Sequence, residues 1–242
     1  MKLGFALSLV LGFFVLATIQ TPGPAHAAAS TPHRQITDPF ALYGDEFVFG
    51  VYRNGDRVGS HRVSFRRQDG DIIVDVYFTV DIRFLFLSAY RYVYVATERW
   101  RGGQLVALEA ETNDNGDVSR VVAKVTEEGD QLLVTGPSGT TFADLGIYAT
   151  NHWHPGIITS EVVLNTITGG LNRVSIIDGG EMQITANGTS ISARRYLYTG
   201  ELSNEVWYDR EGRWVKMRFD GKDGSTIEYT LEQMGDGGAE RS

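Results

Sequence analysis

The stretch from Ile72 to Phe86 alternates between apolar and polar side chains almost without a break. In an extended strand, successive side chains point to opposite faces, so this spacing gives one apolar face and one mostly polar face. A helix would need apolar spacings of three and four, and it would place Asp75 and Asp81 inside its apolar stripe. As one straight strand the run would extend roughly 45 to 50 Å. It therefore predicts antiparallel β-structure, either as one curved strand or as two strands joined near residues 84–88.

The first 27 residues have the pattern of an export signal. Lys2 gives a positive start, residues 3–19 form an apolar run, and Ala25-His26-Ala27 matches a small-x-small cleavage site. The alternative is a retained membrane anchor, but an apolar run of about 17 residues is short for a span, and the prolines that follow it favour cleavage. We expect cleavage after Ala27 and a soluble periplasmic product. The chain has no cysteine, which excludes a lipoprotein signal.

Composition removes several classes of function. Without cysteine there is no disulfide framework, no thiolate metal site and no cysteine nucleophile. The sequence is 42% hydrophobic and 11% aromatic, which is enough for one sizeable core. The net charge is −8, and removal of Lys2 with the signal makes it −9, so bulk charge argues against nucleic acid as a partner.

Four parts are expected along the chain. They are a cleaved signal peptide (1–27), a flexible leader (28–42), a single antiparallel β-domain (43–234) and a disordered tail (235–242). Turns rich in Gly, Asn and Asp recur within the domain, and Asn54-Gly55 is the strongest hairpin signal among them. Residues 136–170 are predicted as loops with one short helix at most, and residues 171–177 and 181–186 as successive strands. The fold class predicted is all-β: a strongly curved sheet or half-barrel of hairpins with one or two short helices.

Four segments carry a resemblance to known proteins. They are Tyr43-Gly44 through Val58-Gly59, Glu98-Arg99-Trp100-Arg101-Gly102-Gly103-Gln104-Leu105, Asn151-His152-Trp153-His154-Pro155, and Trp207-Tyr208-Asp209 through Arg213-Trp214-Val215-Lys216. In them the chain resembles an uncharacterised family of exported bacterial proteins, a domain of unknown function. In architecture it is more distantly similar to the periplasmic lipoprotein carriers of the Lol system. The resemblance implies a curved sheet with an apolar hollow, in which the Lol carriers hold acyl chains; fold alone does not determine function.

The strand predicted at residues 90–100 has a nearly continuous aromatic face. Along this face lie Tyr90, Tyr92, Tyr94, Ala96, Glu98 and Trp100. One interpretation is the wall of a ligand cavity with Glu98 as its polar anchor. The other is cross-strand packing, with Glu98 paired to an arginine at the end of the sheet. Either way, a carboxylate on an aromatic face needs a partner.

The histidines offer a weaker signal. His152 and His154 are two residues apart, so in an extended segment both imidazoles could reach one metal ion. A metal site needs a third ligand, and no Asp or Glu lies within six residues of the pair. The alternative is a loop with Trp153 inserted into the core and the histidines at its rim. His61 shares a strand face with Val63 and is interpreted as a hydrogen-bonded core residue.

These features favour a non-enzymatic periplasmic binding protein without a cofactor, holding an apolar or amphipathic small molecule, with a lipid as one candidate. The expected pocket lining is Phe78, Ile82, Phe84, Tyr92, Tyr94, Glu98 and Trp153. A second interpretation is an envelope structural or interaction module that binds a protein partner through a strand edge. A third is a hydrolase that uses Glu98 or the His152/His154 pair, although the common local signatures of hydrolases and phosphate-binding enzymes are missing from the sequence.

Overall fold

The computed structural model describes residues 37–84 and 87–235. The expected signal peptide, the first part of the leader and residues 236–242 lie outside the described residues. The elements are α1 Pro39–Tyr43, β1 Glu46–Arg53, β2 Asp56–Gln68, β3 Asp71–Phe84, β4 Leu87–Arg101, β5 Gln104–Asp114, β6 Asp117–Val125, β7 Gln131–Gly136, β8 Gly139–Asp144, β9 Tyr148–Ala149, the 3-10 helix η1 Pro155–Thr159, β10 Val162–Leu164, β11 Leu171–Ala186, β12 Thr189–Gly200, β13 Asn204–Asp209, β14 Trp214–Asp220 and β15 Thr226–Met234.

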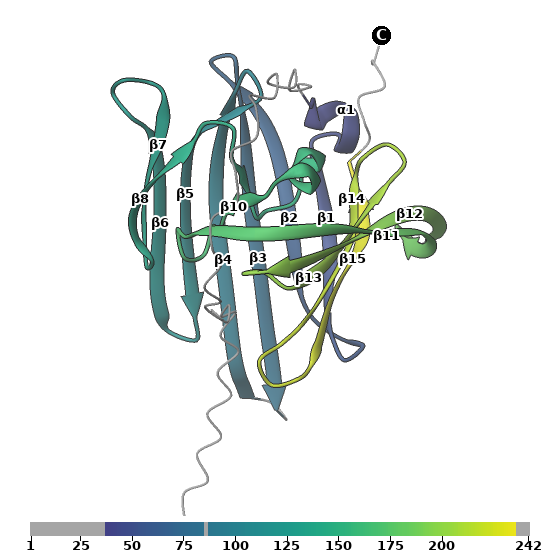
Figure 1. Ribbon diagram of the computed structural model, residues 1–242. Coiled ribbons are helices and arrows are strands. Elements are labelled where there is room, and N and C mark those ends of the chain that lie inside the picture. The colour runs from purple at the N-terminus through teal and green to yellow at the C-terminus, as the bar shows by residue number, and fades with distance from the viewer. Residues whose placement is uncertain (1–36, 85–86, 236–242) are drawn as a thin grey trace, which may run out of the picture.

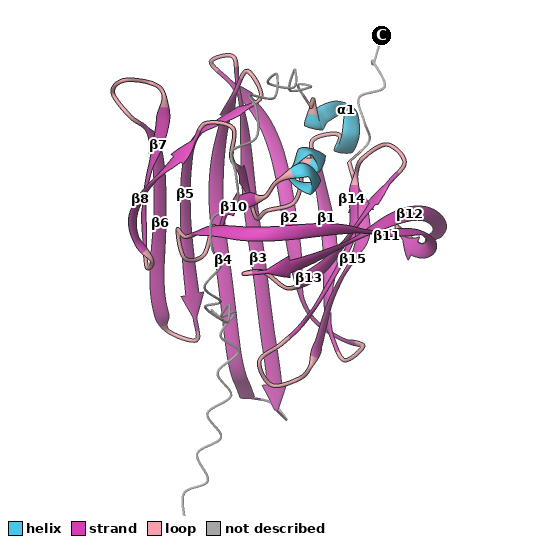
Figure 2. Ribbon diagram, in the orientation of Figure 1, coloured by secondary structure: helices cyan, strands magenta, loops and turns pink. Residues whose placement is uncertain are grey.

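The described strands form one 15-stranded sheet in the order β8-β7-β6-β5-β4-β3-β2-β1-β15-β14-β13-β12-β11-β10-β9. Neighbouring strands pair antiparallel except β9 and β10, which are parallel. The two halves of the sheet meet where β1 pairs with β15. Figure 1 shows β2 to β5 as one layer and β11 crossing in front of them, and Figure 2 shows how little helix accompanies the strands. The predicted all-β, mainly antiparallel fold is confirmed.

The sheet is strongly curved along the seam between its two halves. Phe78 on β3 and Tyr229 on β15 are three strand positions apart in the sheet, yet their rings stack with centroids 5.5 Å apart. In a flat sheet strands three places apart would be separated by about 14 Å. The inner faces of β1 to β4 and of β14 and β15 therefore close around a shared core. Within this core the rings of Phe49 and Trp214 pack with their centroids 4.4 Å apart.

The strand pattern of the sequence holds in detail along this layer. The described part of the long alternating run, residues 72–84, lies in the single strand β3, and β4 begins after the run, at Leu87. On β3, Val74, Val76, Phe78 and Val80 are all buried. The turn between β1 and β2 has positive φ at Asn54 (50°) and Gly55 (92°), as a two-residue hairpin requires. All six residues named on the aromatic face of β4 are buried.

Four expectations are wrong in whole or in part. Residues 39–42 of the expected flexible leader belong to α1, which begins at an Asp38 cap and buries Pro39 and Tyr43. The strands expected at residues 171–177 and 181–186 are one strand, β11, because Gly179-Gly180 forms a bulge within it instead of a turn. The region expected as loops contains β8, which pairs with β7 along its whole length. Gly235, placed in the tail, still donates a backbone hydrogen bond to Glu46.

The β7–β8 turn meets the loop before β11, which brings two distant parts of the sheet together. The amide of Ser138 donates to the carbonyl of Thr168 at 2.8 Å. A Cβ on Gly136 would lie 2.8 Å from that same carbonyl oxygen, so the close approach requires glycine there. This contact fixes the loop at residues 165–170 against the sheet. Among the described residues, no helix has the length and apolar character that crossing a membrane requires.

Candidate functional site

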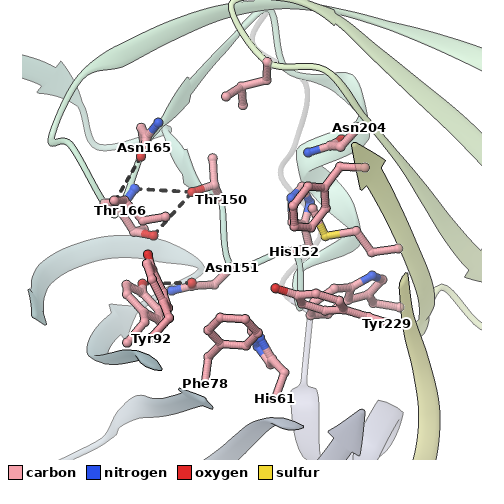
Figure 3. A pocket seen from close by; sticks show the side chains of 16 residues that line it. His61, Phe78, Tyr92, Thr150, Asn151, His152, Asn165, Thr166, Asn204 and Tyr229 are labelled. Atoms are coloured by element: carbon pink, nitrogen blue, oxygen red, sulfur yellow. Dashed lines mark hydrogen bonds between the residues drawn. The ribbon is translucent and has the colours of Figure 1, made fainter. Parts of the chain in front are cut away.

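A cavity of about 90 Å³ lies inside the bend of the sheet, as Figure 3 shows. Its lining consists of His61, Phe78, Tyr92, Tyr94, Thr150, Asn151, His152, Asn165, Thr166, Ile167, Leu202, Asn204, Trp214, Met217, Phe219 and Tyr229. Aromatic rings make most of its floor, and asparagine and threonine side chains lie on the loop side. No acidic residue, lysine or arginine is among the lining residues.

Both halves of the chain build this cavity. Alternation on β2, β3 and β4 turns His61, Phe78 and Tyr92 inward, and β14 and β15 contribute Trp214 and Tyr229 from the other half. Three loops cover these strands, one around residues 150–152, one around 165–167 and one around 202–204. The cavity is thus the space that the curved sheet encloses beneath its covering loops.

Glu98 fastens the first of these loops to β4. This carboxylate is fully buried and accepts three hydrogen bonds. The indole N–H groups of Trp100 and Trp153 donate to Oε2 at 2.7 and 2.8 Å, and the amide of Asn151 donates to Oε1 at 2.5 Å. Burial raises the pKa of the carboxyl, and these three donors act in the opposite direction. The predicted need for a partner is confirmed, but the partners are two indoles and an amide, and none of them is an arginine.

Two tyrosines hold the backbone of the same loop. The Tyr43 hydroxyl donates to the carbonyl of Trp153 at 2.8 Å and accepts from the amide of Trp214 at 2.9 Å. The Tyr208 hydroxyl donates to the carbonyl of His152 at 2.8 Å. His152 has a φ of 57°, a backbone conformation that costs free energy in a non-glycine residue. These contacts keep the His152 side chain directed into the cavity in spite of that cost.

His61 and His152 contribute polar atoms that the surrounding protein leaves unpaired. Both are nine-tenths or more buried, and both rings contact the Trp214 indole, at 5.3 and 5.7 Å between centroids. Among the described residues, both ring nitrogens of His61 lack a hydrogen-bond partner, and so does Nδ1 of His152. Burial lowers the pKa of His61 to about 3 and that of His152 to about 4. The interpretation of His61 as a hydrogen-bonded core residue is therefore wrong, because it is buried without a bond.

His154 points away from its neighbour two residues earlier. Its ring stacks on Trp100 at 5.5 Å, and its Nδ1 accepts a hydrogen bond from the amide of Gly156, capping η1. His152 therefore lines the cavity, whereas His154 caps η1. In the part of the chain that the structure describes, no group of three His, Asp or Glu side chains is arranged to hold a metal ion.

The structure brings together only part of the expected pocket. Phe78, Tyr92 and Tyr94 line the cavity. Glu98 and Trp153 lie behind its wall and support it through Asn151, whose side-chain oxygen accepts from the Tyr94 hydroxyl at 3.0 Å. Ile82 is half-buried and borders a separate surface groove beside the β1–β2 hairpin, and the side chain of Phe84 lies outside the described residues.

The sequence does not indicate the polar part of the lining. His61 and His152 stand out in it for other reasons, and Asn165, Thr166 and Asn204 carry no signal because each lies in or next to an irregular loop. Among the remaining lining residues, Trp214 and Tyr229 could be predicted as core residues, since both lie on the buried face of predicted strands. Nothing local in the sequence shows that β15 bends back to face β3.

Comparison with curated proteins finds no match. Among solved structures, the chain is similar to one described as the crystal structure of a β-barrel-like protein of domain of unknown function DUF1849 from Brucella abortus. The two share 10% sequence identity with a TM-score of 0.49, over 77% of this chain and 94% of that one. The family model of DUF6134, a domain of unknown function, matches residues 49–232. With most of its length matched, the chain belongs to the DUF6134 family.

Proposed function

We propose that this protein is a non-enzymatic periplasmic binding protein that holds a small amphipathic molecule in the cavity of its curved sheet. The observation that carries the proposal is the combination of aromatic walls with buried polar atoms that lack partners. Buried polar groups in native proteins are nearly always hydrogen-bonded, so unpaired ones beside a cavity point to a missing partner inside it. Export, inferred from residues 1–27, supports the periplasmic part of the proposal.

The size of the cavity limits the ligand. At about 90 Å³ it is smaller than an engineered apolar cavity of about 150 Å³ that binds benzene, and far smaller than sites for drug-sized ligands, which have about 300–1,000 Å³. Large side chains such as Phe47, Phe49 and Trp214 fill the rest of the core. The ligand is therefore a compound of a few heavy atoms, or the end of a longer molecule such as the acyl chain of a lipid.

The polar groups around the cavity support binding over catalysis. Both Glu98 oxygens accept hydrogen bonds from N–H donors, which leaves this carboxylate poorly placed to take a proton from a substrate. The hydroxyls of Thr150 and Thr166 lie 3.3 Å from each other, without a histidine bonded to either. A nucleophile activated by a neighbouring base would need such a bond.

An envelope interaction module is the second candidate, and one observation favours it. Exposed apolar side chains lie along the outer face of β3 to β8, on Tyr77, Val95, Val122, Leu133 and Phe142. Tyr77 pairs across the strands with Val95, and Leu133 with Phe142. Apolar surface of this kind is suited to a protein partner. The ligand experiment below separates the two candidates, because an interaction module needs no molecule in its core.

We expect the full-length protein, expressed with its signal and isolated from the bacterial envelope, to carry a small molecule detectable by native mass spectrometry. Met217→Trp is expected to abolish this bound mass, because Met217 lines the cavity and the larger indole would occupy it. Met234→Trp makes the same change on β15, outside the cavity, and is expected to retain the bound mass. Protein that is free of any small molecule in all three forms, with unchanged unfolding temperature after exposure to an envelope extract, would contradict the proposal.

A further inference from the structure

Unpaired polar atoms gather on one side of the cavity. His61 contributes two nitrogens, His152 contributes Nδ1 and Asn204 contributes Oδ1, all buried and unbonded within the described residues. Figure 3 shows Asn204, His152 and Tyr229 along one side of the cavity, with His61 and Phe78 at its base. On the opposite side most polar atoms are paired, such as Thr150 Oγ1, which accepts from the amide of Thr166 at 3.2 Å, and the unpaired atom there is the buried hydroxyl of Tyr92. Most of the free hydrogen-bonding capacity thus lies with His61, His152 and Asn204, which supply four of the five unpaired atoms in the lining.

No ionised side chain lines the cavity to neutralise a charged ligand. The Arg and Lys side chains that form ion pairs do so with carboxylates outside the lining, and the buried Glu98 lies behind the wall with its own three donors. A carboxylate or an ammonium placed here would lose its hydration without gaining a counter-charge, which is strongly unfavourable. The site therefore discriminates against both anions and cations.

The two histidines can satisfy an uncharged group. Their lowered pKa values keep both imidazoles neutral near pH 7, and a neutral imidazole has one N–H donor and one acceptor nitrogen. The side-chain oxygen Oδ1 of Asn204 adds a hydrogen-bond acceptor. A hydroxyl donates one hydrogen bond and accepts others, so it matches this set of donors and acceptors. An ether or an alkyl halide has no hydrogen-bond donor.

We propose that the ligand carries a neutral hydroxyl group, bound by His61, His152 and Asn204, at the end of a short apolar body packed against Phe78, Trp214 and Tyr229. This inference rests on the proposed binding function and adds to it the chemical class of the ligand, a neutral alcohol. It distinguishes that class from fatty acids and amines, whose apolar parts would fit the same walls.

Four probes of equal chain length test the proposal: butan-1-ol, 1-fluorobutane, butanoate and butylammonium. Binding to the mature protein at pH 7 is followed by NMR of the labelled histidine rings. We expect butan-1-ol to shift the His61 and His152 resonances and to bind at least tenfold more tightly than either ion. It is expected to bind about three- to tenfold more tightly than 1-fluorobutane, the range that about one net hydrogen bond gives.

His61→Phe keeps a ring at this position and removes both unpaired nitrogens. It is expected to lower the preference for butan-1-ol over 1-fluorobutane, because only His152 and Asn204 then remain to bind the hydroxyl, while leaving 1-fluorobutane binding intact. The matched control is His154→Phe, which changes a histidine outside the cavity and is expected to leave the preference unchanged. The unfolding transition of each variant is recorded alongside, so that loss of the fold is recognised directly.

The outcomes separate the inference from the function on which it rests. If butanoate or butylammonium binds as tightly as butan-1-ol, or if 1-fluorobutane does, the cavity is a binding site but the inference about the alcohol is wrong. If none of the four probes binds, both the inference and the proposed function are contradicted.

Discussion

Replacing Glu98 with alanine is expected to lower the free energy of unfolding by about 3–5 kcal/mol. The substitution leaves the N–H groups of Trp100, Asn151 and Trp153 without an acceptor in a region closed to solvent. Each buried donor without a partner costs about 1–3 kcal/mol, and relief of the desolvation of the carboxylate offsets part of the sum. Chemical unfolding at pH 7, followed by tryptophan fluorescence, measures the change and reports on two of the affected indoles directly.

The matched control is Glu109→Ala on the neighbouring strand β5. Glu109 is exposed, and its contact with Lys124 is 3.9 Å long, so its loss is expected to change stability by less than about 0.5 kcal/mol. Because Glu98 also positions Asn151 in the cavity wall, Glu98→Ala should weaken ligand binding as well. Equal stability of the two variants would show that the Glu98 cluster does not hold the loop.

The second large effect is a gain in stability. His61→Phe is expected to raise the free energy of unfolding by about 1–2 kcal/mol at pH 7, because it removes two buried nitrogens that have no partner. The ring contacts of His61 with Phe49, Trp214 and Tyr229 are of a kind that phenylalanine also makes. Wild-type histidine would then be retained at a cost to stability, as is typical of residues kept for binding.

The difference between wild type and His61→Phe should widen in acid. An unfolded histidine takes up a proton near pH 6.5, whereas folded His61 does so only near pH 3 and folded His152 near pH 4. Between these values the unfolded state binds more protons, so wild-type stability falls as the pH falls from about 6.5 toward 4. Each histidine contributes a loss of about 2 kcal/mol between pH 7 and pH 5.

Two carboxyl groups also affect how the free energy of unfolding depends on pH. The raised pKa of Glu98 opposes the histidines, since the folded state then holds that proton to higher pH than the unfolded state does. The lowered pKa of Asp71, about 2, stabilises the fold above its unfolded value of 3.8 and matters only in stronger acid. Urea titrations at pH 7 and pH 5 should show that His61→Phe removes about 2 kcal/mol of the acid loss.

His154→Phe is the control for both effects, because it makes the same change where the histidine is bonded. Its Nδ1 accepts from the amide of Gly156, so we expect it to lose about 1 kcal/mol of stability and not to gain any. If both histidine variants are destabilised alike at pH 7, the nitrogens of His61 have partners in solution. In that case His61 would have no free nitrogens to offer a ligand.

The sequence was most informative where structure depends on near neighbours in the chain. The Asn54-Gly55 turn, the long strand β3 and the single buried face of β4 all follow from period-two alternation and turn chemistry. It was least informative at the bulge in β11, where Gly179-Gly180 looks like a turn. Pairing with β12 continues on both sides of that bulge, and a local pattern does not show it.

The site could be predicted only in part for the same reason. Phe78, Tyr92 and Tyr94 were found from their shared strand faces. The partners of Glu98 in the loop are more than 50 residues away, and Tyr43 reaches a carbonyl 110 residues later in the chain. His61 lacks hydrogen-bond partners because side chains from β1, β14 and β15 surround it, and no spacing in the sequence predicts that arrangement.

A crystal structure of the protein isolated from its native envelope would test the central claim most directly. The account predicts continuous non-protein electron density in the cavity, larger than a water molecule and within hydrogen-bonding distance of His61 and His152. Density for separate water molecules alone, or a cavity without density, would contradict the claim that this curved sheet encloses a ligand.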